Sequence, residues 1–328
     1  MKRTWVILVV FAVAGGGALL LAGNGSHTPQ PAGLRTTTQP VATAPTTHAA
    51  EVYPSRQLAD ECQKVAKELQ GKLDDTFNVV VEPPFVVAGN MRAPLLKAHV
   101  QGSVIGPAQA MWNGYLAKKP DKVITVLLFT DNAVRPVGRD TDPGYAYRRW
   151  ARQLFGDTDV SYYGYYKPDK ETMVMNIDTG GGTLVHELTH ALIVYDFPDP
   201  PAWFNEGLGS LHEQCSIGKD DITGLENWRL PDLQEAIKAG KLRPLKDLVT
   251  KDDFRGKGMG LNYAQARYFL MYMQHEDKLK AFYAYYRDHH KGNDAAVKAI
   301  EHIMGHNLAD VEKAYLEWGQ TLSFPPVN

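Results

Sequence analysis

Two histidines and a glutamate stand close together in the segment His186-Glu187-Leu188-Thr189-His190. On an α-helix, residues four positions apart lie on one face, so both imidazoles can point at one ion. Zinc accepts nitrogen ligands, and a catalytic zinc site has three protein ligands plus a water. Glu187 follows the first histidine and can reach that water rather than the metal. Its carboxylate can take the proton of the water and deliver it to a leaving amine, as a general base does.

A zinc site of this kind needs a third protein ligand, and Glu206 is the best candidate. It lies 16 positions after His190, and the prolines between them end the first helix. A second helix that begins near Trp203 can bring the Glu206 carboxylate back to the metal. Its apolar neighbours in the sequence argue against a carboxylate on a solvated surface.

Two other side chains compete for the third ligand position. Asp196 stands six residues after His190, where some zinc peptidases place a ligand after a tight glycine turn. That turn needs glycine at position 193, but Ile193 stands there and is poor at positive φ. His212 is six residues after Glu206 and lies about 120° away from it around the helix. Both are therefore weaker candidates than Glu206.

Supporting roles also have candidate residues. Glu213 shares the helix face of Glu206, and it is either a hydrogen-bond partner of a ligand histidine or a surface charge. A peptidase must also stabilise the oxyanion of its transition state. Tyr263, at the start of a predicted helix over 261–274, could donate to that oxyanion, and Tyr268 on the same helix is a weaker candidate. Packing in the core is the alternative role for both tyrosines.

The first 50 residues differ in composition from the rest of the chain. Lys2 and Arg3 precede an uncharged run over 5–22, which predicts that residues 1–23 are a signal peptide or an N-terminal membrane anchor. Residues 24–50 are rich in Thr, Pro and Ala, and Arg35 is their single charge, so we expect a disordered linker. With either a signal peptide or a membrane anchor, we expect the rest of the protein to be exported. It would then lie in the periplasm, outside the cell or on the outer side of the cytoplasmic membrane.

Composition and charge exclude some classes of partner. The net charge is -2 and no basic stripe or nucleic-acid motif is present, so we expect no nucleic-acid partner. A peptide or protein substrate fits the candidate chemistry, and nothing in the sequence predicts the oligomeric state.

Cys62 and Cys215 are the two cysteines. In an oxidising compartment they form either one disulfide or two buried thiols.

The elements that must position the candidate residues fall into two halves, 51–180 and 181–328. In the first half, helical stretches are predicted over 55–73, 95–118 and 144–155, with β-rich runs within 77–90, a strand over 123–129 and a hairpin that turns near Pro168. In the second half, helices are predicted over 182–195, 203–215, 231–239, 261–274, 276–289, 293–304 and 308–321. This pattern predicts an α+β fold, with a small mixed β-sheet packed on a mainly helical half. The motif helix lies at their junction.

The β-rich segment before the motif helix, "ETMVMNID", has two possible roles. As an edge strand, it could bind an extended peptide by pairing backbone hydrogen bonds. As an interior strand, it would be purely structural.

At these residues the chain resembles the gluzincin metallopeptidases, the superfamily that contains thermolysin. More narrowly, "HELTHALI", "PAWFNEGLGSLHE" and "YAQARYFLMYM" are similar to the peptidase MA-like proteins of bacteria. The resemblance spans about residues 145–275. It implies a zincin-like fold and one zinc ion per chain, with His186, His190 and Glu206 as ligands and Glu187 as the general base. A tyrosine on the later helix of many members supports Tyr263.

The chain departs from that pattern at Ser210, where thermolysin has an aspartate four residues after its third ligand. This departure leaves the partner of the ligand histidine open. The Gly-x-Met-Glu-Asn motif of the aminopeptidases is missing, so the resemblance implies an endopeptidase or a highly selective enzyme. The alternatives are a non-catalytic zinc- or peptide-binding protein of the same fold and a zinc hydrolase that acts on a cell-wall amide.

Overall fold

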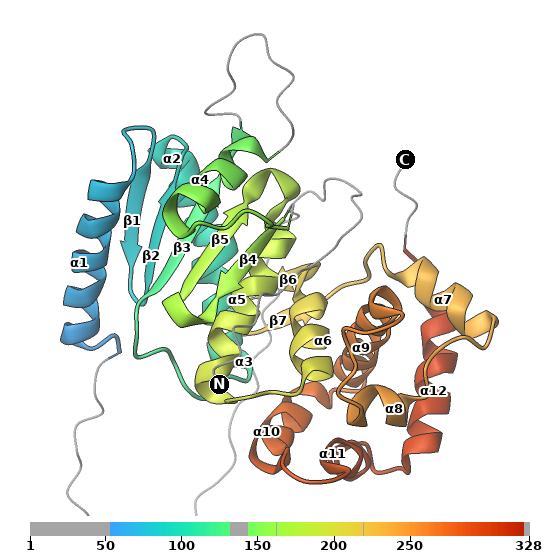
Figure 1. The fold of residues 1–328 in the computed structure, drawn as a ribbon. Helices are drawn as coiled ribbons and strands as arrows, with labels where there is room; N and C mark the ends of the chain where they lie inside the picture. Colours follow the sequence, from blue (N-terminus) through green and yellow to red (C-terminus); the bar gives the residue numbers. More distant parts are fainter. Residues whose placement is uncertain (1–52, 132–143, 162, 219, 325–328) are drawn as a thin grey trace, which may run out of the picture.

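The computed structural model describes residues 53–131, 144–161, 163–218 and 220–324 (Figure 1). The predicted signal peptide or anchor, 1–23, and the predicted linker, 24–50, lie outside the described residues. Within the described ranges, none of the helices combines the length and the apolar composition needed to cross a membrane.

A five-stranded mixed sheet forms the centre of the N-terminal half. Its strands are β1 (Asn78–Glu82), β2 (Phe85–Gly89), β3 (Ile124–Phe129), β4 (Gly164–Lys167) and β5 (Thr172–Asn176). They lie in the order β1-β2-β3-β5-β4; β2, β3 and β5 are parallel, and the outer strands β1 and β4 are antiparallel to their neighbours. Because β5 pairs with both β3 and β4, the expectation that "ETMVMNID" is an edge strand is wrong.

Helices cover both faces of this sheet. On β3, Val126 and Leu128 point into the main core, whereas Leu127 and Phe129 point to the opposite face. The main-core face is covered by α2 (Ala93–His99), the π-helix η1 (Val100–Ile105), α3 (Gly106–Gly114) and α5 (Gly181–Asp196). The other face is covered by α1 (Arg56–Lys72) and α4 (Tyr145–Phe155). Strands covered on both faces are apolar almost throughout, which explains the continuous apolar run that predicted β3.

The C-terminal half is mainly helical, as predicted, and lies beside α5 in yellow to red in Figure 1. Its helices are α6 (Ala202–His212), α7 (Leu230–Lys238), α8 (Leu245–Thr250), α9 (Met259–His275), α10 (Leu279–His289), α11 (Ala295–Met304) and α12 (Leu308–Thr321). A small hairpin of β6 (Cys215–Ile217) and β7 (Ile222–Gly224) follows α6. The α+β prediction is confirmed.

Three local predictions differ from the structure. The predicted helix over 95–118 runs over 93–114 as α2, η1 and α3 without a break in helical backbone, but its middle section η1 is a π-helix, and the helix predicted over 203–215 ends at His212. The hairpin β6–β7 and the short helix α8 were not predicted, because elements of three to six residues are too short to show a period. Cys62 is buried in α1 and Cys215 is partly buried in β6, and both are free thiols, so a disulfide between them is wrong.

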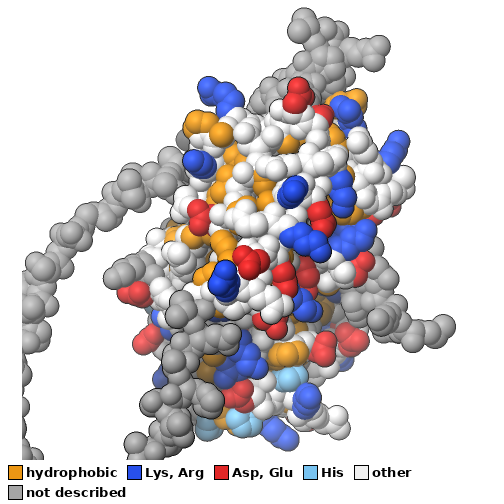
Figure 2. Space-filling view, turned by 90° about the vertical axis from the view of Figure 1, so that its left-hand side faces the viewer, with side chains coloured by type: hydrophobic (Ala, Val, Ile, Leu, Met, Phe, Trp, Pro, Cys, Tyr) orange, Lys and Arg blue, Asp and Glu red, His pale blue; other side chains and the backbone are white. Residues whose placement is uncertain are grey.

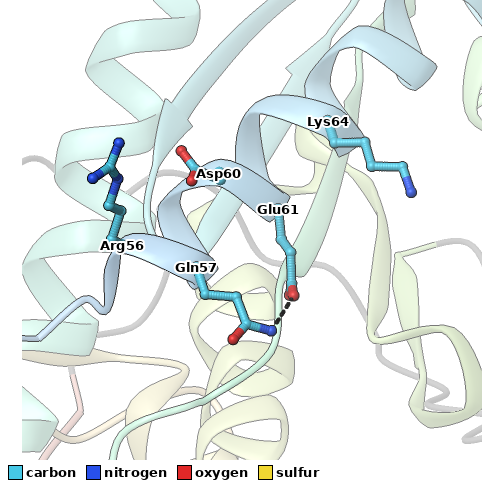
Figure 3. Close-up of a pocket in the computed structure, with 5 residues that line it drawn as sticks. All are labelled: Arg56, Gln57, Asp60, Glu61 and Lys64. Carbon is cyan, nitrogen blue, oxygen red and sulfur yellow. Dashed lines mark hydrogen bonds between the residues drawn. The ribbon is translucent and has the colours of Figure 1, made fainter.

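The outer surface around α1 carries acidic and basic side chains interspersed with smaller apolar areas (Figure 2). A shallow hollow on α1 is lined by Arg56, Gln57, Asp60, Glu61 and Lys64 (Figure 3). All five side chains are exposed and come from one helix, and Gln57 donates to Glu61 at 2.9 Å. This hollow has no buried polar group, and we assign no function to it.

Candidate metal centre

His186, His190 and Glu206 meet in one buried cluster where the two halves of the molecule join. Helix α5 carries both histidines one turn apart, and the proline-rich turn after it lets α6 bring Glu206 opposite them. Oε2 of Glu206 lies 3.4 Å from Nε2 of His186 and 3.5 Å from Nε2 of His190. The three side chains are at most 2% exposed, and their ligand atoms lie within 4.8 Å of one another. This group could hold a metal ion.

The atoms that face one another in the cluster are poorly satisfied by the protein itself. Among the residues that the structure describes, neither Nε2 of His190 nor Oε2 of Glu206 has a hydrogen-bond partner. Buried polar atoms are rarely left in this state. Burial alone would raise the pKa of Glu206, but His190 and His186 hold it well below its usual range. A carboxylate with two imidazoles is a donor set that suits a transition-metal ion.

Gly209 leaves the space that the two imidazoles occupy. A Cβ atom on Gly209 would lie 3.0 Å from Cε1 of His190 and 3.1 Å from Nε2 of His186. Such contacts are tighter than nine in ten real Cβ contacts, so the imidazoles would have to shift by a few tenths of an ångström. Gly209 follows Glu206 by three positions on α6, so the helix that carries the third candidate ligand also makes room for the other two.

Each histidine of the cluster has an acceptor at its other ring nitrogen. Nδ1 of His186 lies 3.1 Å from Oε1 of Glu213, and Nδ1 of His190 lies 2.9 Å from Oδ1 of Asn205. A hydrogen bond donated by Nδ1 fixes the tautomer that leaves a lone pair on Nε2. The structure shows that Glu213 is a hydrogen-bond partner of the candidate ligand His186. The alternative expectation, that Glu213 is a surface charge, is wrong.

Glu213 is held in turn by Arg229. The guanidinium of Arg229 donates to Glu213 from Nε at 3.2 Å and from Nη2 at 3.1 Å, and both side chains are at least nine-tenths buried. Burial would raise the pKa of Glu213, but Arg229 and then His186 lower it, so the group remains a carboxylate. Ser210 supplies no such acceptor, because its hydroxyl is buried and unpartnered among the described residues. The carboxylate that accepts from the candidate ligand His186 is that of Glu213, three positions after Ser210.

Glu187 lies on α5 directly after His186 and is completely buried. Neither of its carboxylate oxygens has a hydrogen-bond partner within the described ranges. Burial raises the pKa of Glu187, while His190 and His186 oppose that rise. Within the described ranges, the protein therefore leaves this buried carboxyl group without a hydrogen bond.

The two candidate tyrosines of α9 have different surroundings. The Tyr263 hydroxyl is buried and has no hydrogen-bond partner among the described residues. Burial raises the pKa of Tyr263, and the Glu206 carboxylate raises it further. The Tyr263 ring lies 5.4 Å from the guanidinium of Arg229, which holds Glu213. The Tyr268 hydroxyl instead accepts from N of Asn227 at 2.9 Å and donates to its carbonyl oxygen at 3.1 Å. Tyr268 thus serves packing.

The two rival ligands lie in other hydrogen-bond networks. Asp196 accepts a hydrogen bond from the Tyr283 hydroxyl at 2.9 Å and is not part of the cluster. His212 uses both ring nitrogens, because Nδ1 lies 2.9 Å from Oγ1 of Thr189 and Nε2 lies 2.8 Å from the Tyr115 hydroxyl. The structure brings neither side chain to His186 and His190.

Four residues of the centre were not predicted. They are Asn205, Gly209, Arg229 and Arg255, whose Nη2 donates to Oε1 of Glu206. Asn205 and Gly209 flank Glu206 within "FNEGLG" and could have been weighed as neighbours of a ligand. Arg229 and Arg255 lie in loops remote in sequence from both motif helices, and nothing in the local sequence pattern marks them.

No known protein-family profile matches this chain, and no curated protein sequence matches it. Because fold alone does not determine function, the side chains of the metal centre are the basis for a functional assignment.

Proposed function

We propose that this chain is an exported, zinc-dependent metallopeptidase of the gluzincin type that hydrolyses peptide bonds. The observation that carries the proposal is the arrangement of Glu187 beside His186, His190 and Glu206. A fully buried carboxyl group with no partner among the described residues stands next to three candidate ligand atoms. A buried carboxyl group without a hydrogen bond lowers the stability of the folded protein. Such groups cluster at functional sites, where they take part in catalysis.

The residues would divide the work as follows. His186 and His190 would hold zinc through Nε2, and Glu206 would hold it through Oε2. Zinc bound there lowers the pKa of a coordinated water to about 7 and polarises the scissile carbonyl. Glu187 accepts a proton from the attacking water and delivers it to the leaving amine nitrogen. Tyr263 donates a hydrogen bond from its hydroxyl to the oxyanion as negative charge develops there.

The size of the ligand set favours catalysis over a structural role. Structural zinc sites are closed by four protein ligands, whereas catalytic sites have three and leave one position open. In the described part of the chain, the cluster contains three ligand side chains. Glu213 and Asn205 hold the imidazoles from behind, as partners of catalytic zinc ligands do.

Export and substrate class are further parts of this proposal. The sequence of residues 1–23 supports a signal peptide or an outward-facing anchor, and 24–50 would hold the catalytic body away from a membrane. The resemblance to gluzincins supports a peptide or protein substrate, with no nucleic-acid partner.

The first experiment measures the zinc content of the full-length chain for wild type and Glu206→Ala side by side. Glu68→Ala, an exposed position of α1, is the matched control. We expect about one zinc per chain in wild type and in the control, and a large loss in Glu206→Ala. Equal zinc in all three proteins would contradict the ligand assignment. No zinc in wild type, even after zinc is added back, would favour a non-catalytic binding protein.

A second experiment separates the substrate classes. The zinc-loaded protein is incubated with a mixture of peptides and, separately, with cell-wall fragments, and the products are identified by mass. Cleavage of peptides supports the proposal. Release of amide-cleavage products from cell-wall fragments alone would identify a zinc hydrolase of another class.

A further inference from the structure

The two oxygens of Glu206 face different partners. Oε2 faces the two imidazoles at 3.4 and 3.5 Å. Oε1 accepts a hydrogen bond from Nη2 of Arg255. The Glu206 side chain is completely buried, whereas the Arg255 side chain is 32% exposed and so forms part of the rim around the cluster. One carboxylate thus joins the candidate metal position on one side to a cation on the other.

The loop that carries Arg255 is anchored to α9. Phe254 is buried, and its ring lies 5.1 Å from that of Tyr263, centroid to centroid. The carbonyl oxygen of Phe254 accepts a hydrogen bond from Nδ2 of Asn262 at 2.7 Å. Gly258 then takes a positive φ of 78° to enter α9, a conformation that glycine adopts at little cost. These contacts fix the backbone on both sides of Arg255 and direct its side chain at Glu206.

We propose that Arg255 is a positioning residue that restricts Glu206 to one ligand oxygen. Because Oε1 is occupied by the guanidinium, Oε2 alone faces the metal position. A carboxylate that bound through both oxygens would take up a second coordination position beside the one that a catalytic site keeps for water. This inference rests on the metal-binding part of the proposed function, and it does not depend on which bond the protein hydrolyses.

Charge explains why an arginine suits this place. A buried carboxylate without a counter-charge is costly, and Arg255 supplies a counter-charge at the oxygen that points away from the histidines. A cation close to a metal ion also repels it, which argues against a role in raising affinity. The cationic side chain donates a hydrogen bond to Oε1, and this hydrogen bond sets which oxygen is turned toward the histidines.

The test uses cobalt(II) in place of zinc, because the visible absorption of cobalt reports its coordination number. Four-coordinate cobalt absorbs strongly, and the absorption weakens when a further oxygen binds. We expect Arg255→Met to weaken the visible band about twofold or more, and Arg255→Lys, which keeps a cationic donor, to restore it. Arg243→Met is the matched control, because Arg243 forms an ion pair with Asp253 of the Arg255 loop, and no ion pair between Arg243 and the three candidate ligands is found among the described residues.

The outcomes separate the inference from the proposed function. An unchanged cobalt spectrum in Arg255→Met would overturn the positioning role while leaving the metal centre intact. A wild-type chain that binds neither cobalt nor zinc would overturn the metal centre and the inference with it. A weakened band in Arg255→Met, with wild-type spectra in Arg243→Met and Arg255→Lys and unchanged near-ultraviolet circular dichroism in all three, supports the inference.

Discussion

Gly209 lies so close to His190 that a Cβ atom on it would come within 3.0 Å of Cε1 of the imidazole. An alanine at position 209 would therefore push both histidines away from Glu206. We expect Gly209→Ala to lower zinc affinity by about tenfold or more, as loss of ligand positioning does. The crowding should also lower the free energy of unfolding of the metal-free protein by roughly 1–3 kcal/mol. Competition with a chromophoric chelator measures the affinity, and urea denaturation measures the stability.

Gly71→Ala is the matched control for that substitution. A Cβ on Gly71, in α1, would meet no atom within 4 Å. Alanine in a helix is favoured over glycine by about 0.5–1 kcal/mol, so this variant should be as stable as wild type or more so, with unchanged zinc affinity. Wild-type zinc affinity in Gly209→Ala would show that the histidines do not depend on the space at this glycine.

The hydrogen bond from His186 to Glu213 should contribute to metal binding in a similar way. Glu213→Gln keeps the shape of the side chain but weakens the acceptor and leaves Arg229 without its counter-charge. We expect zinc affinity to fall by about 10–100-fold, the range found for partners of ligand histidines. Isothermal titration with zinc measures it, with Glu68→Gln on the surface of α1 as control. Equal affinities in the two variants would count against the orienting role of Glu213.

The local geometry of this site was predictable, whereas its surroundings were not. His186 and His190 share a helix face because spacing along a helix fixes it, and prolines between the motifs made the return of Glu206 foreseeable. Contacts of Glu213 with Arg229 and of Glu206 with Arg255 arise only when loops remote in sequence fold against α6. No period or propensity in the local sequence encodes them.

The fold shows the same division. The continuous apolar run of β3 and the amphipathic face of α1 predicted their elements, because burial pattern is local in sequence. Strand order is not local, and the expectation that β5 lies at an edge failed for that reason: its hairpin with β4 was predicted, whereas its parallel pairing with β3, which comes from a distant part of the sequence, was not. The predicted helix over 95–118 contains Gly102 and Gly106-Pro107, and the structure has a π-helical section over 100–105 before α-helical hydrogen bonding resumes in α3.

Glu187→Gln should separate metal binding from catalysis. The amide cannot accept a proton from water, so we expect the rate of peptide cleavage to fall by about 10²–10⁴-fold, the usual contribution of a general base. Zinc content should stay at the wild-type value, because Glu187 is not one of the three candidate ligands. The measurement pairs zinc analysis with cleavage of a fluorogenic peptide mixture, and Glu68→Gln serves as control. Cleavage by Glu187→Gln at the wild-type rate would sink the proposed mechanism.

Tyr263→Phe tests the donor to the oxyanion. The hydroxyl has no hydrogen-bond partner among the described residues, so its removal should leave the folded protein about as stable as before. We expect kcat to fall by about 10²–10³-fold with zinc content unchanged. Tyr268→Phe is a matched control on the same helix: it loses hydrogen bonds to the Asn227 backbone and about 1 kcal/mol of stability, but keeps kcat. The same kcat in both variants would remove Tyr263 from the mechanism.

His212 should make the metal-free protein less stable in mild acid. Burial, with Arg267 and His186 adding to it, lowers the pKa of His212 to about 3, whereas an unfolded histidine titrates near 6.5. Below that pH the unfolded chain binds a proton that the folded chain does not, so stability falls as pH falls toward 3 and is unaffected above about 7.5. From pH 7 to pH 5 the loss due to this one group is about 2 kcal/mol.

Substitution of His212 isolates this contribution. His212→Gln removes the titrating group, and loss of hydrogen bonds to Thr189 and Tyr115 should cost roughly 1–3 kcal/mol at every pH. The difference in unfolding free energy between pH 7 and pH 5 should nevertheless be about 2 kcal/mol smaller than in wild type. Urea denaturation in the presence of a chelator measures it, since metal binding has its own pH dependence. His306→Gln, at an exposed position, is the control. The same pH dependence in His212→Gln and wild type would mean that His212 does not stay neutral in the folded protein.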